Sequence, residues 1–379
     1  MYLPKYGMLC GFLLMTSCCF IYRFIDSHSI PLLFSLFGED YPIGGKPLSI
    51  FIENVESRFN IDSIGCSDCG CKFNEHDTLE PLIHCILKKS QFATKNKTEA
   101  TFIFAPIYTN NLRNLNISAN MNQIFKNDNA FKKWKGSRHL VVDSYMSLHS
   151  NQEYSSSVKS DHVLITTNLT IENIRASRWI TSRHILVPPL QMRQNYPIMT
   201  KTRKFLFLGN SSEIKELFEK IKSSEDATSM TSENLLIENS ENLNHVIDEV
   251  AISQFTVIHS SGGFTPFFIY EILRAGSMPV FIGPPFLPAY ANTHVNYSKV
   301  SVRIPLSKIS IFNERIQKVE IEEVLNEIKQ ARKFLMWPLD GIATQDNAAG
   351  VLFDYLNTRH RVLRPLLRRT FIGSDKLLP

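Results

Sequence analysis

The fold is decided by residues 255–280, which read FTVIHSSGGFTPFFIYEILRAGSMPV. An apolar run ends at His259, and the glycine pair Gly262 and Gly263 follows it. Glycine lets the chain turn sharply and lets a ligand approach the backbone. A helical pattern and a second apolar run come next. This strand–turn–helix–strand pattern is typical of a doubly wound α/β domain, which binds nucleotides at such turns.

Two charged side chains lie on the helical part of this stretch. Glu271 precedes Arg274 by about one turn, so both project from similar faces of one helix. A carboxylate there is suited to accept hydrogen bonds from ribose hydroxyls, and a guanidinium is suited to stabilise charge on a departing phosphate. His259, at the carboxyl end of its strand, is a further candidate for ligand contact. The alternative is an ordinary βαβ unit in which Glu271 and Arg274 are solvated.

Length and charge restrict the class of protein. The chain has 379 residues, enough for two domains, and its composition is that of a globular protein. A net charge of +5 is mild and argues against a dedicated nucleic-acid binder. The positive excess gathers at residues 359–369, which we interpret as a solvated basic tail or as a surface for acidic glycans or membranes.

The N-terminus carries a targeting signal. Residues 7–22 are uncharged and mostly apolar, and we interpret residues 1–25 as a short tail and a signal anchor. A cleaved signal peptide and a lipoprotein signal at Cys18 and Cys19 are the alternatives. Five N-glycosylation sequons follow, which favours a lumenal body. They begin at Asn96, Asn116, Asn168, Asn210 and Asn296.

Four cysteines gather just beyond this segment, and none follows them. They are Cys66, Cys69, Cys71 and Cys85. In an oxidising lumen we expect disulfides, whose connectivity the sequence does not choose. The alternative is a structural zinc site made of the four thiolates, or one that includes His76 or His84.

The body alternates apolar strands with helical patterns, which predicts parallel sheets covered on both faces. Strands are expected at 101–107, 139–143, 162–167, 184–187, 204–209, 235–238, 255–259, 279–283 and 300–304. Helices are expected at 213–222, 244–253, 266–275 and 314–337, and a polar loop at 223–232. The expected fold class is α/β with two facing Rossmann-like domains. The expected parts are an anchor segment (1–25), a stem (26–60), an N-terminal domain (61–200), a C-terminal domain (201–345) and a helical basic tail (346–379).

An ordered series of motifs resembles the exostosin-type glycosyltransferases over about residues 64–340. The series comprises CSDCGC, EATFIFAPIYT, WKGSRHLVVD, HILVPP, KFLFLGN, the glycine turn, YEILRAGSMPV and NYSKVSVRIPLSKI. The resemblance implies the glycosyltransferase B fold, a nucleotide-sugar co-substrate that is usually UDP-linked, and inverting transfer to a glycan or glycoprotein hydroxyl. It also implies a type II membrane protein of the Golgi, with the acceptor at the N-terminal domain and the donor at the C-terminal one.

Candidate site residues follow for the two substrates. Gly262, Gly263, Glu271, Arg274 and His259 would bind the donor. An inverting transfer needs a base for the acceptor hydroxyl, and Asp143 and His139 are the candidates. No DxD element with hydrophobic flanks is present, so a metal-bridged pyrophosphate is not inferred and any divalent metal stays open.

The sequence departs from the family pattern before and after the glycine turn. The family commonly has arginines where Ser260 and Phe268 stand here. This departure keeps two other functions open. The first is a catalytically silent homologue that assembles with an active transferase, and the second is a lumenal or surface glycan-binding protein.

Overall fold

A computed structural model gives the architecture of the chain from Pro47 onward. The structure describes residues 47–56, 79–108, 124–134, 138–143, 163–167, 184–196, 198–209, 212–221, 227–230, 240–259, 268–283, 288–291 and 293–358. The predicted anchor (1–25) and residues 359–379 of the basic tail lie outside these residues. No helix among the described residues is long and apolar enough to cross a membrane.

The first half of the described chain forms a six-stranded sheet with the order β2-β1-β3-β4-β5-β6. The strands are β1 (Ile50–Ile52), β2 (Ala93–Thr94), β3 (Phe102–Phe104), β4 (His139–Asp143), β5 (Val163–Thr166) and β6 (His184–Leu186), and the pairings between them are parallel. Two described helices accompany them, α4 (Leu79–Lys89) and α7 (Asn129–Trp134). All five residues of β4 and all four of β5 are buried, as expected of parallel strands covered on both faces.

The second half forms a five-stranded parallel sheet with the order β11-β10-β9-β7-β8. Its strands are β7 (Arg203–Leu208), β8 (Ala227–Met230), β9 (Ser253–His259), β10 (Met278–Ile282) and β11 (Val302–Ile304). Its helical elements are α11 (Ser212–Ile221), α12 (Ser240–Ile252), α13 (Phe268–Arg274), α14 (Tyr297–Val300), η2 (Leu306–Ile311), α15 (Phe312–Gln317) and α16 (Ile321–Leu335).

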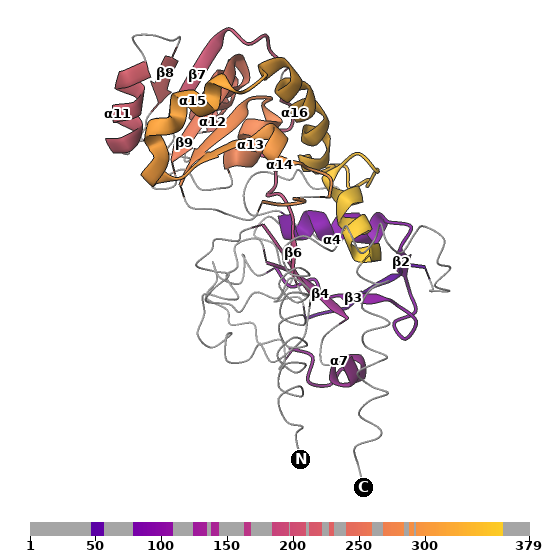
Figure 1. Ribbon diagram of the computed structural model, residues 1–379. Helices are drawn as coiled ribbons and strands as arrows, with labels where there is room; N and C mark the ends of the chain where they lie inside the picture. The colour runs from indigo at the N-terminus through magenta and orange to yellow at the C-terminus, as the bar shows by residue number, and fades with distance from the viewer. Residues whose placement is uncertain are drawn as a thin grey trace, which may run out of the picture. The chain divides into compact units, whose positions relative to one another are not determined.

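Two groups of helices cover this second sheet. Phe207 of β7 contacts Phe218 of α11 and Phe312 of α15, with ring centroids 5.6 and 6.4 Å away. Helices α12, α13 and α16 form the other group and lie beside one another, against the central strands (Figure 1). Residues 205–208 are all buried, because both faces of β7 are covered.

The two sheets share one topology. Numbered from their own first strands, they run 2-1-3-4-5-6 and 2-1-3-4-5, which is the doubly wound order of flavodoxin-like folds. In this order the direction of winding reverses between the first and third strands, and ligands bind beside the carboxyl ends of those two strands. The predicted α/β class with two parallel-sheet domains is therefore confirmed.

Three predicted elements need correction. The strand β1 lies inside the predicted stem (26–60), so the first sheet begins earlier than expected. The strand β8 replaces the polar loop predicted at 223–232, since Ala227–Met230 pairs with β7. The single helix predicted over 314–337 is two helices, α15 and α16, because α15 ends in a cap at Lys318. The strand predicted at 235–238 lies outside the described residues.

The chain beyond α16 returns to the elements of the first sheet. Residues 348–358 are helical, and Phe353 packs on Phe92 with ring centroids 4.9 Å apart. Lys89 at the end of α4 donates to the Asp340 carbonyl over 2.8 Å. Gly341 has φ +75°, and a Cβ there would lie 2.8 Å from Cys85 Sγ, so only glycine fits this crossing without displacement. The first part of the predicted tail is thus packed against the body of the protein.

Candidate functional site

The carboxyl ends of β7 and β9 mark the reversal point of the second sheet. His259 ends β9, is buried, and pairs in register with Ile282 of β10. Gly209 follows β7 with φ 134°, a conformation that favours glycine, and its N–H donates to the Met230 carbonyl. The structure thus places His259 at the edge where doubly wound sheets bind ligands, as the sequence predicted. Gly262 and Gly263 lie outside the described residues.

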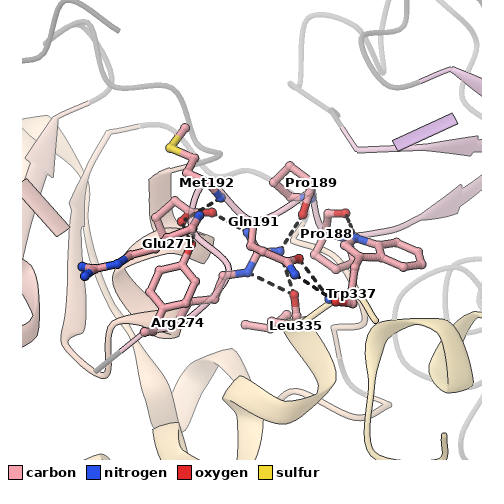
Figure 2. Close-up of polar contacts among 10 residues, drawn as sticks. Pro188, Pro189, Gln191, Met192, Glu271, Arg274, Leu335 and Trp337 are labelled. Atoms are coloured by element: carbon pink, nitrogen blue, oxygen red, sulfur yellow. Dashed lines mark hydrogen bonds and ion pairs between the residues drawn. The ribbon is translucent and has the colours of Figure 1, made fainter. Parts of the chain in front are cut away.

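The helix α13 follows β9 in the chain and carries the two charged residues of the motif. Glu271 and Arg274 form a buried ion pair, with side chains 2% and 0% exposed (Figure 2). Neither residue is solvated, so the interpretation of an exposed helix face is wrong. A buried charge is tolerated only when it is paired and its hydrogen bonds are satisfied, and the surrounding contacts meet that requirement.

The Arg274 guanidinium binds two backbone carbonyls besides Glu271. Its Nε and Nη2 donate to the Leu335 carbonyl over 3.0 and 2.7 Å, and Nη2 also donates to the Pro189 carbonyl over 2.5 Å. These acceptors lie 61 and 85 residues away in the sequence. Hydrogen bonds to a charged donor contribute about 1.5–3 kcal/mol each, so Arg274 joins α13 to two distant segments.

The Glu271 carboxylate accepts from three donors. Arg274 binds Oε1, while the Tyr196 hydroxyl and the Met192 N–H bind Oε2, the latter over 3.4 Å. Burial raises the pKa of Tyr196 well above its usual value, and the negative charge of Glu271 raises it further. The Tyr196 hydroxyl therefore stays protonated and acts as a donor to the carboxylate.

The tyrosine belongs to the segment 188–196, which follows β6 and which we call the linker segment. Gln191 and Trp337 exchange two hydrogen bonds of 2.9 and 3.1 Å, and the Trp337 indole N–H donates to the Pro188 carbonyl over 2.9 Å. Arg332 of α16 donates to the Tyr196 carbonyl. Figure 2 shows the contacts of Trp337 with Gln191 and Pro188, beside those of Arg274. The linker segment is thus held against both α13 and the end of α16.

The two predicted bases lie at opposite ends of β4. Asp143 ends the strand, is buried, and is in register with Thr166 of β5, so it lies at the carboxyl edge where the sequence placed it. His139 begins the strand, four residues earlier, away from that edge. The structure therefore does not bring the two residues together, and the base role of each stays a prediction.

His139 has the surroundings of a core residue. Its side chain is 0% exposed, lies between Phe125 and Phe131 with ring centroids 5.2 and 5.0 Å away, and its Nε2 contacts Asp128 over 3.2 Å. Lys97 binds the same Asp128 and also Glu53. Burial lowers the pKa of His139 to about 4, more than the Asp128 carboxylate raises it.

A second histidine lies on α4, beside the first sheet, and the sequence suggests it only as an alternative zinc ligand. His84 on α4 is half-buried, and its Nδ1 lies 2.8 Å from the Tyr108 hydroxyl and its ring 5.6 Å from Phe104 at the end of β3. Burial, with a smaller effect from Lys88, lowers its pKa to about 4, so it is neutral at pH 7. The only signal in the sequence was its place in an amphipathic helix beside a strand that ends in a tyrosine-bearing turn.

The described part of the chain includes three of the predicted modification residues. Cys85 is buried on α4. Asn96 and Asn296 are exposed, and each side-chain oxygen accepts from the hydroxyl of its own sequon, Thr98 or Ser298. Cys66, Cys69, Cys71, Asn116, Asn168 and Asn210 lie outside the described residues. Among the described residues, no group of three or more His, Cys, Asp or Glu side chains is arranged to hold a metal ion.

A family model shows what class of protein this is. The Exostosin GT47 domain model matches residues 44–319, which is most of the chain. The chain therefore belongs to the exostosin GT47 family and is a glycosyltransferase by family. The match also covers β1, in agreement with the early start of the first sheet. No curated protein sequence matches the chain.

Similar solved structures were found at low identity. The glycotransferase of kitacinnamycin is 10% identical, with a TM-score of 0.34, over 82% of this chain and 100% of that one. The GtfA/B complex is 10% identical, with a TM-score of 0.37, over 75% of this chain and 60% of that one. Sucrose-phosphate synthase from Thermosynechococcus elongatus is 10% identical, with a TM-score of 0.33, over 73% of this chain and 75% of that one.

Proposed function

We propose that the protein transfers a hexosyl or pentosyl group from a UDP-linked sugar to a hydroxyl of a glycan or glycoprotein, with inversion. The observation that carries the proposal is the position of α13, directly after the central strand β9 of a doubly wound sheet, with a carboxylate and a guanidinium in its sequence. A nucleotide at the reversal point of this sheet would lie beside His259, which ends β9, and would be near the glycine pair Gly262 and Gly263 that follows in the sequence. Glu271 would then bind a ribose hydroxyl.

Transfer of the sugar develops negative charge on the departing β-phosphate, which positioned N–H groups and cations stabilise. Arg274, which its hydrogen bonds to the Leu335 and Pro189 carbonyls hold in place, would supply positive charge. The base that takes the acceptor proton is proposed as Asp143, at the carboxyl edge of the first sheet, with His139 as the other candidate. A nucleotide sugar is the only co-substrate proposed, and a divalent metal stays open.

A second candidate is favoured by one specific observation. The two charged groups of α13 already bind partners within the protein, and Glu271 is 2% exposed. Together with Ser260 and Phe268 in place of the arginines common in the family, this is also what a silent homologue would have. Such a protein would assemble with an active transferase and use no donor itself.

Two measurements on the purified protein separate these candidates. The first is a thermal melt with and without UDP, and the second is a screen of nucleotide sugars for hydrolysis. A ligand at a hundred times its Kd stabilises the folded state by about 2.7 kcal/mol. A transferase should show a raised midpoint together with hydrolysis of one donor. A raised midpoint without hydrolysis of any donor favours the silent homologue, and no shift with any nucleotide contradicts the transferase proposal.

The cellular placement is proposed from the sequence: a single-pass type II Golgi membrane protein whose body faces the lumen. Expression in a glycosylating cell, followed by amidase digestion, should lower the apparent mass, and the absence of a shift would contradict this placement. Replacing Asn96 and Asn296 by Gln should remove part of that shift, since both side chains are exposed.

The cysteine cluster is proposed as a disulfide framework in the same lumen. Intact-mass analysis should find Cys66, Cys69, Cys71 and Cys85 without free thiols and the protein without bound zinc. One zinc per chain, released by a chelator with loss of the fold, would support the metal alternative.

A further inference from the structure

The linker segment contributes a hydrogen-bond donor to the carboxylate that the proposed function assigns to the nucleotide. We infer that Tyr196, held by Arg332, is a positioning residue of the donor site and acts through Glu271. This inference rests on the proposed function, because it concerns how the ribose-binding group is held. It extends the donor site to a segment that belongs to neither of the two sheets.

The acceptor capacity of Glu271 limits what it can bind. An ionised carboxylate has about four lone-pair positions on its two oxygens. Arg274 takes one position on Oε1, and Tyr196 and Met192 approach Oε2. One position therefore remains, on Oε1. This remaining lone-pair position can accept one ribose hydroxyl. The direction in which the lone pair points depends on the orientation of the carboxylate plane.

Tyr196 is itself fixed at both ends. Its hydroxyl accepts from the Arg193 N–H over 3.3 Å while it donates to Glu271. Its carbonyl accepts from Arg332 of α16. The hydroxyl is buried and cannot turn to another donor or acceptor without losing these contacts. A donor held this firmly sets the orientation of the group to which it donates, because rotation of the carboxylate would break the bond.

Arg274 alone would not hold the carboxylate plane. Its Nη1 donates to one oxygen of Glu271, while its Nε and Nη2 donate to the Leu335 and Pro189 carbonyls. A carboxylate bound through one oxygen rotates about its terminal torsion, which is a broad one. The second oxygen accepts from the Tyr196 hydroxyl and, over a long 3.4 Å, from the Met192 N–H, so Tyr196 supplies the stronger of the two contacts that limit this rotation. Loss of the Tyr196 hydroxyl should therefore weaken ribose recognition specifically.

The test is the preference of the protein for UDP over its 2′-deoxy and 3′-deoxy analogues. The variant Tyr196→Phe keeps the ring and removes the hydroxyl. The matched control is Tyr290→Phe, which also removes one buried hydroxyl, here one that donates to the Ala348 carbonyl over 2.8 Å, with no contact to Glu271. Titrations of the three nucleotides into the wild type and both variants give the preference, and a melt of each protein shows whether it is folded.

The wild type should bind UDP more tightly than at least one deoxy analogue. In Tyr196→Phe this preference should shrink by roughly two- to tenfold, the effect of one hydrogen bond, while the affinity for the weaker analogue stays level. In Tyr290→Phe the preference should be unchanged even where the melting midpoint falls. A role in folding alone would lower the midpoint and leave the preference intact.

The outcomes distinguish the inference from the function on which it rests. A wild type that binds neither UDP nor the analogues overturns the proposed function, and the inference with it. A wild type with the preference and a folded Tyr196→Phe variant that keeps it in full overturn the inference alone. If Tyr196→Phe does not fold, Arg332→Met, which frees the Tyr196 carbonyl, should reduce the same preference by a smaller factor. A full preference in Arg332→Met would then overturn the inference.

Discussion

The two sheets have the same strand order, and each domain has a buried contact between an acidic and a basic side chain. The two contacts are built differently. In the first sheet, Asp128 contacts the ring of His139, with side chains 10% and 0% exposed. In the second, Glu271 binds Arg274, with side chains 2% and 0% exposed. Asp128 and His139 are 11 positions apart in the sequence. Arg274 also binds the Pro189 carbonyl, which is 85 positions away.

The difference lies in how each buried base avoids an unpaired charge. His139 is enclosed by Phe125 and Phe131, and its pKa is lowered, so it becomes neutral. The guanidinium of Arg274 instead has its charge met by Glu271 and two backbone carbonyls. A neutral core histidine stabilises one region locally, while a charged arginine makes three chain segments depend on one another.

The largest effect is expected from Arg274→Met. This change leaves Glu271 buried without its cation, and it frees the Leu335 and Pro189 carbonyls. Breaking a buried pair in this way costs about 3–5 kcal/mol of unfolding free energy. Denaturant unfolding would measure it. The matched control is Arg203→Met: its ion pair with Glu249 is more exposed, at 18% and 21%, and should contribute about 1 kcal/mol or less. We call Arg274, Glu271 and the Leu335 and Pro189 carbonyls the joint, because their contacts connect α13 with the end of α16 and the linker segment. Equal losses of unfolding free energy in the two variants would contradict this role of Arg274.

The next effect concerns acid stability through His139. Its folded pKa of about 4 is lower than the usual 6.5, so the unfolded chain binds a proton first as the pH falls. The contribution of the neutral His139 to the free energy of unfolding should therefore be fully present above pH 6.5 and be lost between pH 6.5 and 4. The loss from this single site should be about 2 kcal/mol at pH 5. Lys97 and Arg138 also disfavour the proton on His139, while Asp128 favours it.

Melts of wild type and His139→Gln across this range test the prediction. The variant should show a flatter acid limb, although His84, whose pKa is also lowered to about 4, should leave part of the slope. His245 on α12 is exposed, and His245→Gln serves as the control with a slope like that of the wild type. The same slope in His139→Gln and wild type would contradict a neutral, buried His139.

A smaller effect is expected from Trp337→Phe. The change removes the indole donor to the Pro188 carbonyl and keeps the backbone contacts of residue 337 with Gln191. One lost buried hydrogen bond should lower the unfolding free energy by about 1 kcal/mol. The affinity for UDP should stay near the wild-type value, because Trp337 does not contact Glu271. A large loss of affinity with little loss of stability would mean that Trp337 belongs to the ligand site.

Sequence patterns predicted the central strands and missed the marginal ones, for physical reasons. Residues 140–142 and 255–258 are buried on both faces and therefore appear as apolar runs. The strand β8 has the sequence ATSM, lies at the sheet edge, and needs partners on one side only, so its composition is that of a loop. The strand β1 follows closely on residues 42–47, a stretch with prolines and glycines, so the sequence pattern assigns it to the stem.

The site shows a similar limit. The spacing of Glu271 and Arg274 predicted that they share one helix face, and they do contact each other. Their other partners, Tyr196, Pro189 and Leu335, are brought to α13 by the tertiary fold. No local sequence pattern indicates contacts between residues that are 61 or 85 positions apart. The sequence therefore predicted a pair that faces a ligand and did not predict the joint of which the pair is part.

The central claim is that the Glu271 carboxylate serves a nucleotide as well as the joint. The most direct measurement titrates UDP into wild type and Glu271→Gln and records a melt of each. The variant keeps the size of the side chain and removes its charge, so its pair with Arg274 weakens and the midpoint should fall. If the carboxylate also binds ribose, UDP affinity should fall by roughly ten- to a hundredfold, the effect of one charge-assisted hydrogen bond. A lower midpoint with unchanged UDP affinity would show that Glu271 serves the joint alone and would contradict the donor site proposed at α13.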